Sequence, residues 1–516
     1  MVNNSINTVV KGSGFILFGS VFSSILLLAV NIFIARIWGK NDLGIYALAL
    51  SFLNLFSTIG GLGVANGVTR NLAYYKGKKD YKIIPDIITS SILLVTITSF
   101  LIAILLFVFS DYIAVNIFNN SSLKLPLIVF SFAIPINNIT NILVSIFRGF
   151  KEIKPLVYIQ QILKNTLFFS FIVILIITNQ SFIFIIYVYL LTDILTCLTM
   201  IIYSYKKISG YEILSNVRME FTQTKPLLLF SLPILATSIL NTSTNWINTL
   251  MIGGLTSSTA SVGLYISVVV ITGFIGFPVG ILLVLYMPVI SNLCGSDKKN
   301  EIKRIYYILT KWLCFITLPI FLFLFLFSEE VIYFFYGQEY ILGSITLKIL
   351  LIGSIIGNFA GPNGSTLIAI GKPKLVMYSI LLAAITNIGL NIFLIPEYGI
   401  EGAAVALMIS VIIFNLIKNI TLYLKIKVQP LQYNLIKPTI LTIFVISVIF
   451  VSIKHFFSIQ LWFTTISLII FYAIYFSFYI ITKSIDIEDI NIINIIGKKL
   501  HINTNLITKI MLLGKK

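Results

Sequence analysis

Two oppositely charged residues lie near the middle of long apolar stretches, where charges are rare. Lys164 follows Pro155 by nine residues, about 14 Å along a helix, and Asp193 falls at a similar depth in the next stretch. A charge at the centre of a bilayer costs about 3 kcal/mol and is seldom kept without a partner or a function. We predict that Lys164 and Asp193 form an ion pair lining a polar cavity; the alternative is a purely structural lock.

Other polar side chains in the apolar stretches fall on single helical faces. The stripes are Asn137, Asn141, Ser145 and Arg148; Asn241, Asn245 and Asn248; Ser354, Asn358 and Ser365; and Asn387 and Asn391. An amide that faces lipid lacks a hydrogen-bond partner, so each stripe should face another helix or a watered cleft. Hydrogen bonds between helices explain any single stripe, whereas four stripes spread over both halves of the chain favour a shared cavity.

Three arginines close the apolar stretches. Arg36 ends the first stretch at the outer edge, while Arg70 and Arg148 follow the second and fourth at the inner edge. Guanidinium groups make bidentate contacts to phosphate, so the inner two are candidates for binding an anionic headgroup. Topological anchoring is the alternative. The lysines near stretch ends are expected to snorkel toward the surface: Lys311, Lys348 and Lys418.

Membrane-crossing helices must position these residues. A bilayer core of about 30 Å takes about 20 helical residues to cross. We predict fourteen spans, at 12–37, 43–66, 83–110, 123–147, 155–178, 181–203, 225–253, 259–292, 305–327, 343–370, 375–396, 402–424, 434–453 and 459–482. With 58% hydrophobic and 10% charged residues, a water-soluble globule is excluded. The first stretch lacks a small-residue cleavage site, so we expect a retained helix and no signal peptide.

The formal net charge of +18 follows this topology. With the N-terminus inside, most of the 36 lysines and arginines fall in inner segments, and only Arg36, Lys40, Lys124 and Lys454 fall in outer ones. This bias is typical of the positive-inside rule. It predicts a multi-pass protein of the cytoplasmic membrane with both termini in the cytoplasm, and it needs no nucleic-acid partner. Three cysteines without CxxC spacing and two histidines offer few metal ligands, so no cofactor or metal is expected.

The two halves of the chain repeat each other. Leu43-Gly44-Ile45-Tyr46 recurs as Val262-Gly263-Leu264-Tyr265, and Lys154-Pro155 recurs as Lys372-Pro373, at an offset of about 220 residues. Six spans separate the copies, so both halves enter the membrane in the same direction, as in transporters with parallel repeats. We predict an N-terminal six-helix lobe over 1–203, a cytoplasmic linker over 204–225, a C-terminal lobe over 226–424, two extra helices over 425–482 and a cytoplasmic tail over 483–516.

Three motifs resemble those of the polysaccharide flippases, a family of the multidrug/oligosaccharidyl-lipid/polysaccharide exporter superfamily. They are Ala35-Arg36-Ile37-Trp38-Gly39-Lys40 continuing to Tyr46, then Tyr336-Gly337-Gln338-Glu339-Tyr340, and Ile370-Gly371-Lys372-Pro373. The resemblance covers about residues 5–480. It implies a V-shaped, MATE-like pair of six-helix bundles that moves a polyprenyl-(pyro)phosphate-linked oligosaccharide to the outer leaflet. It also implies basic residues for the phosphate, here Arg36, Arg70, Arg148 and Lys164, and a lipid-guiding role for the last two spans.

Alternatives remain at this stage. A multidrug exporter of the same fold should have an acidic, aromatic cavity, yet the spans hold more bases than acids. A membrane glycan polymerase or ligase needs a carboxylate or histidine pair, and the longest outer loop, about 328–342, offers only three glutamates. We predict a non-enzymatic flippase that works by alternating access. Its expected partners are the lipid-linked oligosaccharide, membrane lipids and glycan-assembly enzymes.

Overall fold

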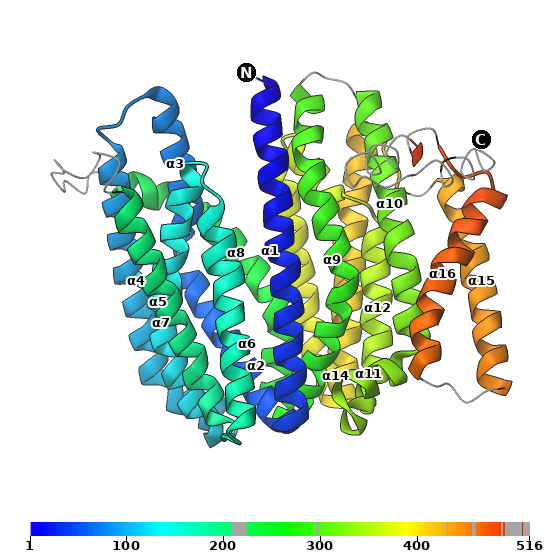
Figure 1. The fold of residues 1–516 in the computed structure, drawn as a ribbon, viewed down its shortest axis with the longest axis horizontal. Helices are drawn as coiled ribbons and strands as arrows, with labels where there is room; N and C mark the ends of the chain where they lie inside the picture. Colours follow the sequence, from blue (N-terminus) through cyan, green and yellow to red (C-terminus); the bar gives the residue numbers. More distant parts are fainter. Residues whose placement is uncertain are drawn as a thin grey trace. The chain divides into compact units, whose positions relative to one another are not determined.

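A computed structural model describes residues 2–208, 224–295, 299–430, 432–456, 461–486, 489–490 and 508 (Figure 1). Throughout this part of the chain the structure is helical and contains no β-strand. The predicted all-α membrane fold is therefore confirmed. Most of the predicted linker and of the predicted tail lies outside the described residues.

The helices follow one another with short connections. In the first half they are α1 (Val2–Ile37), α2 (Gly39–Gly60), α3 (Val64–Lys78), α4 (Ile84–Tyr112), η1 (Ile113–Ile117), η2 (Ser121–Leu123), α5 (Lys124–Gly149), η3 (Leu156–Leu163), α6 (Lys164–Ile177) and α7 (Ile183–Ile208). In the second half they are α8 (Thr224–Thr256), α9 (Thr259–Gly295), α10 (Lys299–Leu326), α11 (Ser328–Tyr336), η4 (Gln338–Gly343), α12 (Ser344–Phe359), α13 (Asn363–Ala369), α14 (Pro373–Ile426), α15 (Tyr433–Phe456) and α16 (Leu461–Ile481).

Twelve helical segments of the described chain are long and apolar enough to cross a membrane. One of them, α14, has 54 residues, more than twice the roughly 20 that one crossing of a bilayer core takes. Its backbone is non-helical at Gly399 (φ 56°, ψ −130°), shortly after Pro396, where it divides into the two predicted spans 375–396 and 402–424. The described apolar part of α16, Ile466–Ile481, is shorter. The count of fourteen spans stays a prediction.

Several predicted spans differ in detail from the helices. The second span ends at Gly60, because Leu62 and Gly63 adopt left-handed conformations, and α3 then extends through the predicted lysine-rich loop. The tenth span breaks at Gly361 (φ 70°) and Pro362 into α12 and α13. The segment 328–342, predicted as an outer loop, instead forms α11 and the 3₁₀ helix η4.

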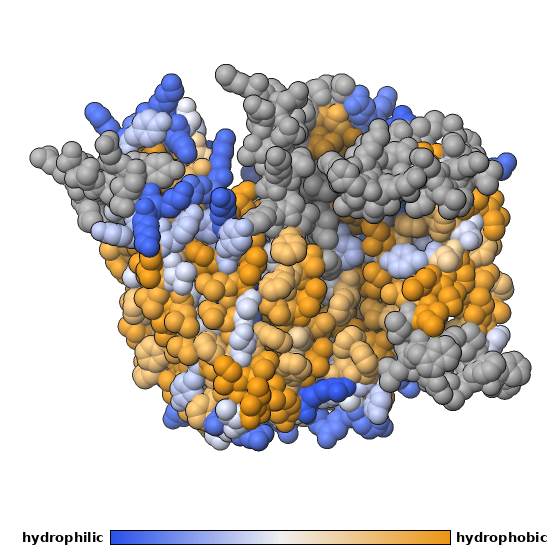
Figure 2. Space-filling model, viewed as in Figure 1, coloured by the Kyte–Doolittle hydropathy of each residue, from blue (hydrophilic) through white to orange (hydrophobic). Residues whose placement is uncertain are grey.

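The sides of the helices present apolar side chains to the surroundings. On α4, the exposed residues include Phe100, Leu101, Ile104 and Val108, the last at 63% exposure. Figure 2 shows apolar residues covering much of the helical surface, with hydrophilic residues gathered toward the helix ends. An apolar surface of this extent is unfavourable in water and favourable in contact with lipid. The chain is therefore a multi-pass membrane protein.

The chain divides into two compact units. Unit 1 comprises residues 1–267 and 388–403, and unit 2 comprises 268–387 and 404–516. Within unit 1, α5 is the central helix and packs against α2, α3, α4 and α7. Its apolar face joins α3 and α4 in a core that includes Val68, Leu72, Ile87, Ile146 and Phe147. The lobe boundaries proposed from the repeat stay a prediction.

Candidate functional site

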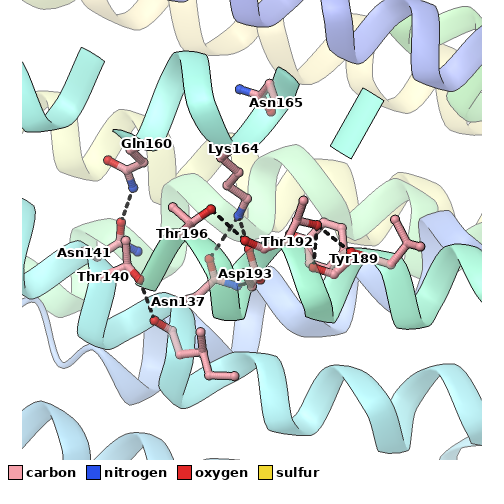
Figure 3. Close-up of polar contacts among 12 residues, drawn as sticks. Asn137, Thr140, Asn141, Gln160, Lys164, Asn165, Tyr189, Thr192, Asp193 and Thr196 are labelled. Atoms are coloured by element: carbon pink, nitrogen blue, oxygen red, sulfur yellow. Dashed lines mark hydrogen bonds and ion pairs between the residues drawn. The ribbon is translucent and has the colours of Figure 1, made fainter. Parts of the chain in front are cut away.

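A charged cluster lies inside unit 1, where α5, α6 and α7 meet (Figure 3). Lys164 Nζ lies 2.5 Å from Asp193 Oδ1. Asn137 bridges the pair, because its Nδ2 donates to Asp193 Oδ2 at 2.5 Å and its Oδ1 accepts from Lys164 Nζ at 3.3 Å. Asp193 is only 2% exposed, whereas the Lys164 side chain is 21% exposed. The predicted ion pair is confirmed, and its amide partner comes from the predicted stripe on the fourth span.

A second polar contact lies one helical turn from the first. Gln160 Nε2 donates to Asn141 Oδ1 at 2.6 Å, and Asn141 is exposed (Figure 3). Residues 137 and 141 are four apart on α5, and 160 and 164 are four apart along η3 and α6, so the two contacts lie on facing helix surfaces. Together they form a polar ladder that runs from an exposed amide to the buried carboxylate.

The ladder helix carries a further polar face that sequence analysis missed. Asn165 Nδ2 donates to Ser23 Oγ at 2.9 Å, and Gln161 Nε2 donates to Ser20 Oγ at 3.1 Å. These contacts join η3 and α6 to α1. The i, i+4 spacings of Gln160 with Lys164 and of Gln161 with Asn165 were visible in the fifth span and would have identified this face.

The ladder begins in a π-helix. η3 covers Leu156–Leu163, and Lys164 opens the α-helix that follows. A π-helix has more than four residues in a turn, so it rotates the following side chains relative to a regular α-helix. Such stretches are rare and occur frequently at functional sites. The local geometry therefore presents both Gln160 and Lys164 to α5.

Aromatic rings lie next to the ion pair. Lys164 Nζ is 5.3 Å from the ring centroid of Tyr189, within cation–π range. The Tyr189 ring packs against Phe130 at 4.9 Å and Phe168 at 5.5 Å, and all three rings contact Tyr46. Tyr46 belongs to the repeated sequence motif. The rings exclude water from one side of the pair, which strengthens its electrostatic attraction.

The predicted amides of α8 divide into exposed and buried residues. Asn241 and Asn245 are exposed, and they lie outside the charged cluster. Asn248 is 2% exposed and donates to the Tyr265 hydroxyl at 2.9 Å, while its Oδ1 accepts from Asn391 Nδ2 at 2.8 Å. The Asn248 and Asn391 side chains therefore form hydrogen bonds between helices. Asn358 lies on α12 in unit 2, and its Nδ2 is buried without an acceptor in the described chain.

The three predicted arginines are exposed, but only Arg36 and Arg148 lie at helix ends, because α3 (Val64–Lys78) continues past Arg70. Arg36 is in the last turn of α1, and Arg70 lies on α3 with its guanidinium 4.5 Å from the Phe230 ring. Arg148 is in the last turn of α5, about 16 Å along that helix from Asn137. The ladder therefore combines Lys164, Asp193, Asn137 and Asn141, but none of the arginines is a member.

Two lysines expected to snorkel are buried instead. Lys311 is 3% exposed, and its ammonium contacts Asp486 Oδ2 at 2.6 Å, the Asp489 carboxylate and the Ser484 carbonyl at 3.1 Å. Lys418 is 5% exposed. The snorkelling prediction is wrong for both residues, because a docked segment neutralises the first and packing encloses the second. In the described residues, no group of three or more His, Cys, Asp or Glu is placed to hold a metal ion.

The arrangement defines a class of protein. The chain is all-helical and multi-pass, and it buries an ion pair and amides among its spans. Such an arrangement is suited to binding polar ligands within a membrane. The polar ladder contains no nucleophile with an adjacent base. Comparison with known proteins specifies the family. The chain belongs to the polysaccharide biosynthesis protein family, whose model matches residues 9–294, and the MatE model matches residues 233–393.

Individual relatives agree with this assignment. Stage V sporulation protein B of Bacillus subtilis is 22% identical over 470 residues, covering 83% of this chain and 87% of the relative. A Shigella flexneri protein named as an O-antigen transporter is 22% identical over 419 residues, covering 79% of this chain and 96% of the relative.

Solved structures show the same fold. The inward closed conformation of lipid II flippase MurJ has a TM-score of 0.68 at 19% identity, covering 90% of this chain and 97% of that one. An inward-facing multidrug resistance MATE family transporter of the MOP superfamily has a TM-score of 0.65 at 16% identity, and the match covers 78% of this chain and 94% of that one. The predicted membership of the polysaccharide flippases of this superfamily is confirmed.

Proposed function

We propose that this chain is a flippase that moves a polyprenyl-(pyro)phosphate-linked oligosaccharide from the inner to the outer leaflet by alternating access. The family assignment and the names of its relatives support this function. In this mechanism the sugar and phosphate enter a polar path through the protein while the isoprenoid tail stays in lipid. Only the headgroup then loses its water, which keeps the cost of transfer low.

The polar ladder of unit 1 is the observation that supports the proposal most directly. Sugar hydroxyls both donate and accept hydrogen bonds, and the exposed Asn141 with Gln160 offers them matching amides. Deeper in the ladder, Lys164 carries a cation that phosphate oxygens attract. Asp193 neutralises the charge of Lys164, which stabilises the lysine in the membrane before the substrate arrives.

Further assignments belong to the same proposal. The candidate substrate-binding residues are Arg36, Arg70, Arg148, Lys164, Asp193, Asn137, Asn141, Asn241, Asn245 and Asn358. We place the protein in the cytoplasmic membrane with both termini inside, since basic residues concentrate in the corresponding segments. We assign it no enzymatic step of its own. Glycan-assembly enzymes are then the partners that make the substrate on one side and use it on the other.

The flippase proposal is tested by reversing or removing charges in cells that make the surface glycan. Arg148→Glu and the neutral double variant Lys164→Met/Asp193→Asn should trap the glycolipid on the cytoplasmic leaflet, with normal amounts of protein in the membrane. Lys151→Glu, an exposed lysine near Arg148, is the matched control and should leave surface glycan unchanged. Normal surface glycan in both test variants would contradict the mechanism.

A multidrug exporter of the same fold is the second candidate. It is favoured by the MatE match over residues 233–393 and by the fold of the MATE transporter. An exporter should lower the accumulation of lipophilic cations in cells and should leave glycolipid distribution untouched. The flippase should do the reverse, so one pair of assays on the same cells separates the two functions.

A further inference from the structure

Unit 2 contains a second buried polar cluster, where α13 meets the later part of α14. Lys418 lies on α14 between Asn415 and Asn419 and is 5% exposed. Asn363, at the start of α13, donates one Nδ2 hydrogen to Asn415 Oδ1 and the other to Asn419 Oδ1, both at 3.0 Å. Lys418 is eight residues from Ile426, the end of α14, and so lies about 12 Å inside the helix end.

The Lys418 ammonium has no counter-ion in the part of the chain that the structure describes. Its Nζ lies 3.3 Å from the centroid of the Phe414 ring. On another side it faces Gly364, where an added Cβ would be 3.9 Å from Nζ. An aromatic ring stabilises a cation only in part, and a charge this deep in a membrane is seldom kept without a partner or a function. Lys164, by contrast, has the counter-ion Asp193.

The break in the tenth predicted span positions this cluster. Gly361 has φ 70°, and the Tyr306 hydroxyl donates to the freed Ala360 carbonyl at 2.7 Å. An added Cβ at Gly361 would lie 2.4 Å from Thr310 Oγ1, so only glycine fits there. The redirected chain places Asn363 and Gly364 against α14. Interrupted helices within a membrane are typical of binding sites.

The cluster has more free donors than free acceptors. Asn415 and Asn419 each accept one hydrogen bond from Asn363 at the side-chain oxygen, and Asn415 Nδ2 donates to the Val411 carbonyl at 2.9 Å. The Asn419 amide nitrogen therefore remains as a donor. Lys418 adds an ammonium with three hydrogens. Unused donors around an unpaired cation suit an anionic oxygen ligand.

We propose that Lys418, with the amides that surround it, forms an anion site that binds the phosphate oxygens of a diphosphate. If the proposed flippase function holds, this diphosphate is the linkage of the glycolipid. The shared chemistry is the phosphoryl oxygen, whether it comes from a free diphosphate, a prenyl diphosphate or a phospholipid.

Calorimetric titration of the purified full chain in nanodiscs tests the site. Inorganic pyrophosphate and farnesyl diphosphate serve as probes, in phosphatidylcholine and in phosphatidylglycerol. Lys418→Met should weaken pyrophosphate binding at least about tenfold, since a hydrogen bond to a charged group is lost. Lys418→Arg should retain binding. Lys348→Met, a lysine of α12 that is only partly buried, is the matched control and should bind like the unaltered chain.

The probes identify the source of the phosphate. Tighter binding of farnesyl diphosphate than of pyrophosphate supports a lipid-linked ligand, and competition by phosphatidylglycerol alone supports the phosphate site and assigns it to phospholipid. Unchanged pyrophosphate affinity in Lys418→Met overturns the proposal, as does an absence of binding to the unaltered chain. If Lys418→Met does not fold, amine labelling of the unaltered chain replaces it: Lys418 should be protected by pyrophosphate, and equal labelling overturns the site.

The test of the anion site can fail or succeed independently of the test of the flippase proposal. Glycolipid transport without any effect of Lys418→Met on pyrophosphate binding contradicts the anion site alone. Pyrophosphate binding through Lys418 in a protein that moves no glycolipid contradicts the proposed function alone.

Discussion

Gly44 and Gly263, which hold equivalent positions in the sequence repeat, pack against each other in unit 1. A Cβ added to Gly44 would lie 1.8 Å from the Thr259 carbonyl oxygen, and a Cβ added to Gly263 would lie 1.9 Å from the Lys40 carbonyl oxygen. Lys40 and Thr259 each precede their own glycine by four residues, so the contact is reciprocal. The starts of α2 and α9 therefore cross backbone to backbone.

Substitution of either glycine should disrupt this crossing. Gly44→Ala and Gly263→Ala each force the two backbones apart, and overpacking of this kind costs about 1–3 kcal/mol or more. We expect a lower melting temperature and loss of transport in both variants. Gly273→Ala is the control on α9, since nothing lies within 4 Å of its added Cβ. Equal melting temperatures for Gly263→Ala and Gly273→Ala would show that the crossing is not close.

Single and double substitutions can separate the structural role of the Lys164–Asp193 pair from its role in transport. Removal of one partner leaves a buried charge uncompensated and should cost about 3–5 kcal/mol, in Lys164→Met as in Asp193→Asn. The double variant removes both charges and should recover most of that stability, as measured by thermal unfolding in detergent. It should nevertheless fail to move glycolipid, because the cation is gone. Recovery of transport together with stability would identify the pair as a structural lock.

The amides of α8 should behave differently according to their burial. Asn248→Ala removes two hydrogen bonds between helices, each worth about 0.6 kcal/mol on average in membranes, and should lower stability by about 1 kcal/mol. Asn245→Ala, one turn away and exposed, should leave stability unchanged and should reduce transport. Thermal unfolding and flipping are measured on both variants. An equal loss of stability would contradict the assignment of Asn245 to the substrate path.

The contact of Lys311 with the C-terminal segment should protect that segment from proteolysis. Lys311→Met removes the cation shared by Asp486 and Asp489, and the indole of Trp312, which donates to Asp489 Oδ1 at 3.0 Å, cannot replace it. Limited proteolysis should therefore cut the chain after Ile481 at least about tenfold faster, since local opening becomes easier. Lys303→Met on the same helix is the control. Identical cleavage rates in the two variants would rule out such protection.

The sequence predicted the contacts that depend only on how deep a residue lies in the membrane. Lys164 and Asp193 belong to consecutive spans, so equal distance from the same membrane surface places them side by side in an antiparallel pair. The same reasoning identified Asn137 and Asn141, because a stripe on one helix face stays together whatever that helix packs against. The all-helical fold followed from composition and span length.

The remaining contacts depend on tertiary structure that local patterns do not encode. Lys311 has carboxylate partners about 175 residues later in the chain, in a segment that carries no helical pattern. Lys418 is buried because the chain turns at Gly361, and a glycine inside an apolar run does not reveal whether it kinks or packs. The π-helix that begins the ladder is likewise set by packing. Hydropathy places a helix in the membrane but does not determine its rotation.

Transbilayer movement in reconstituted vesicles tests the central claim most directly. A fluorescent polyprenyl-diphosphate oligosaccharide is placed in one leaflet, and its arrival in the other is followed by quenching, with a prenyl-free fluorescent sugar as control. The unaltered chain should speed the movement of the diphosphate glycolipid well above that in protein-free vesicles, and the neutral double variant of Lys164 and Asp193 should not. Movement at the same rate with both proteins, or with neither above the protein-free rate, would contradict the account.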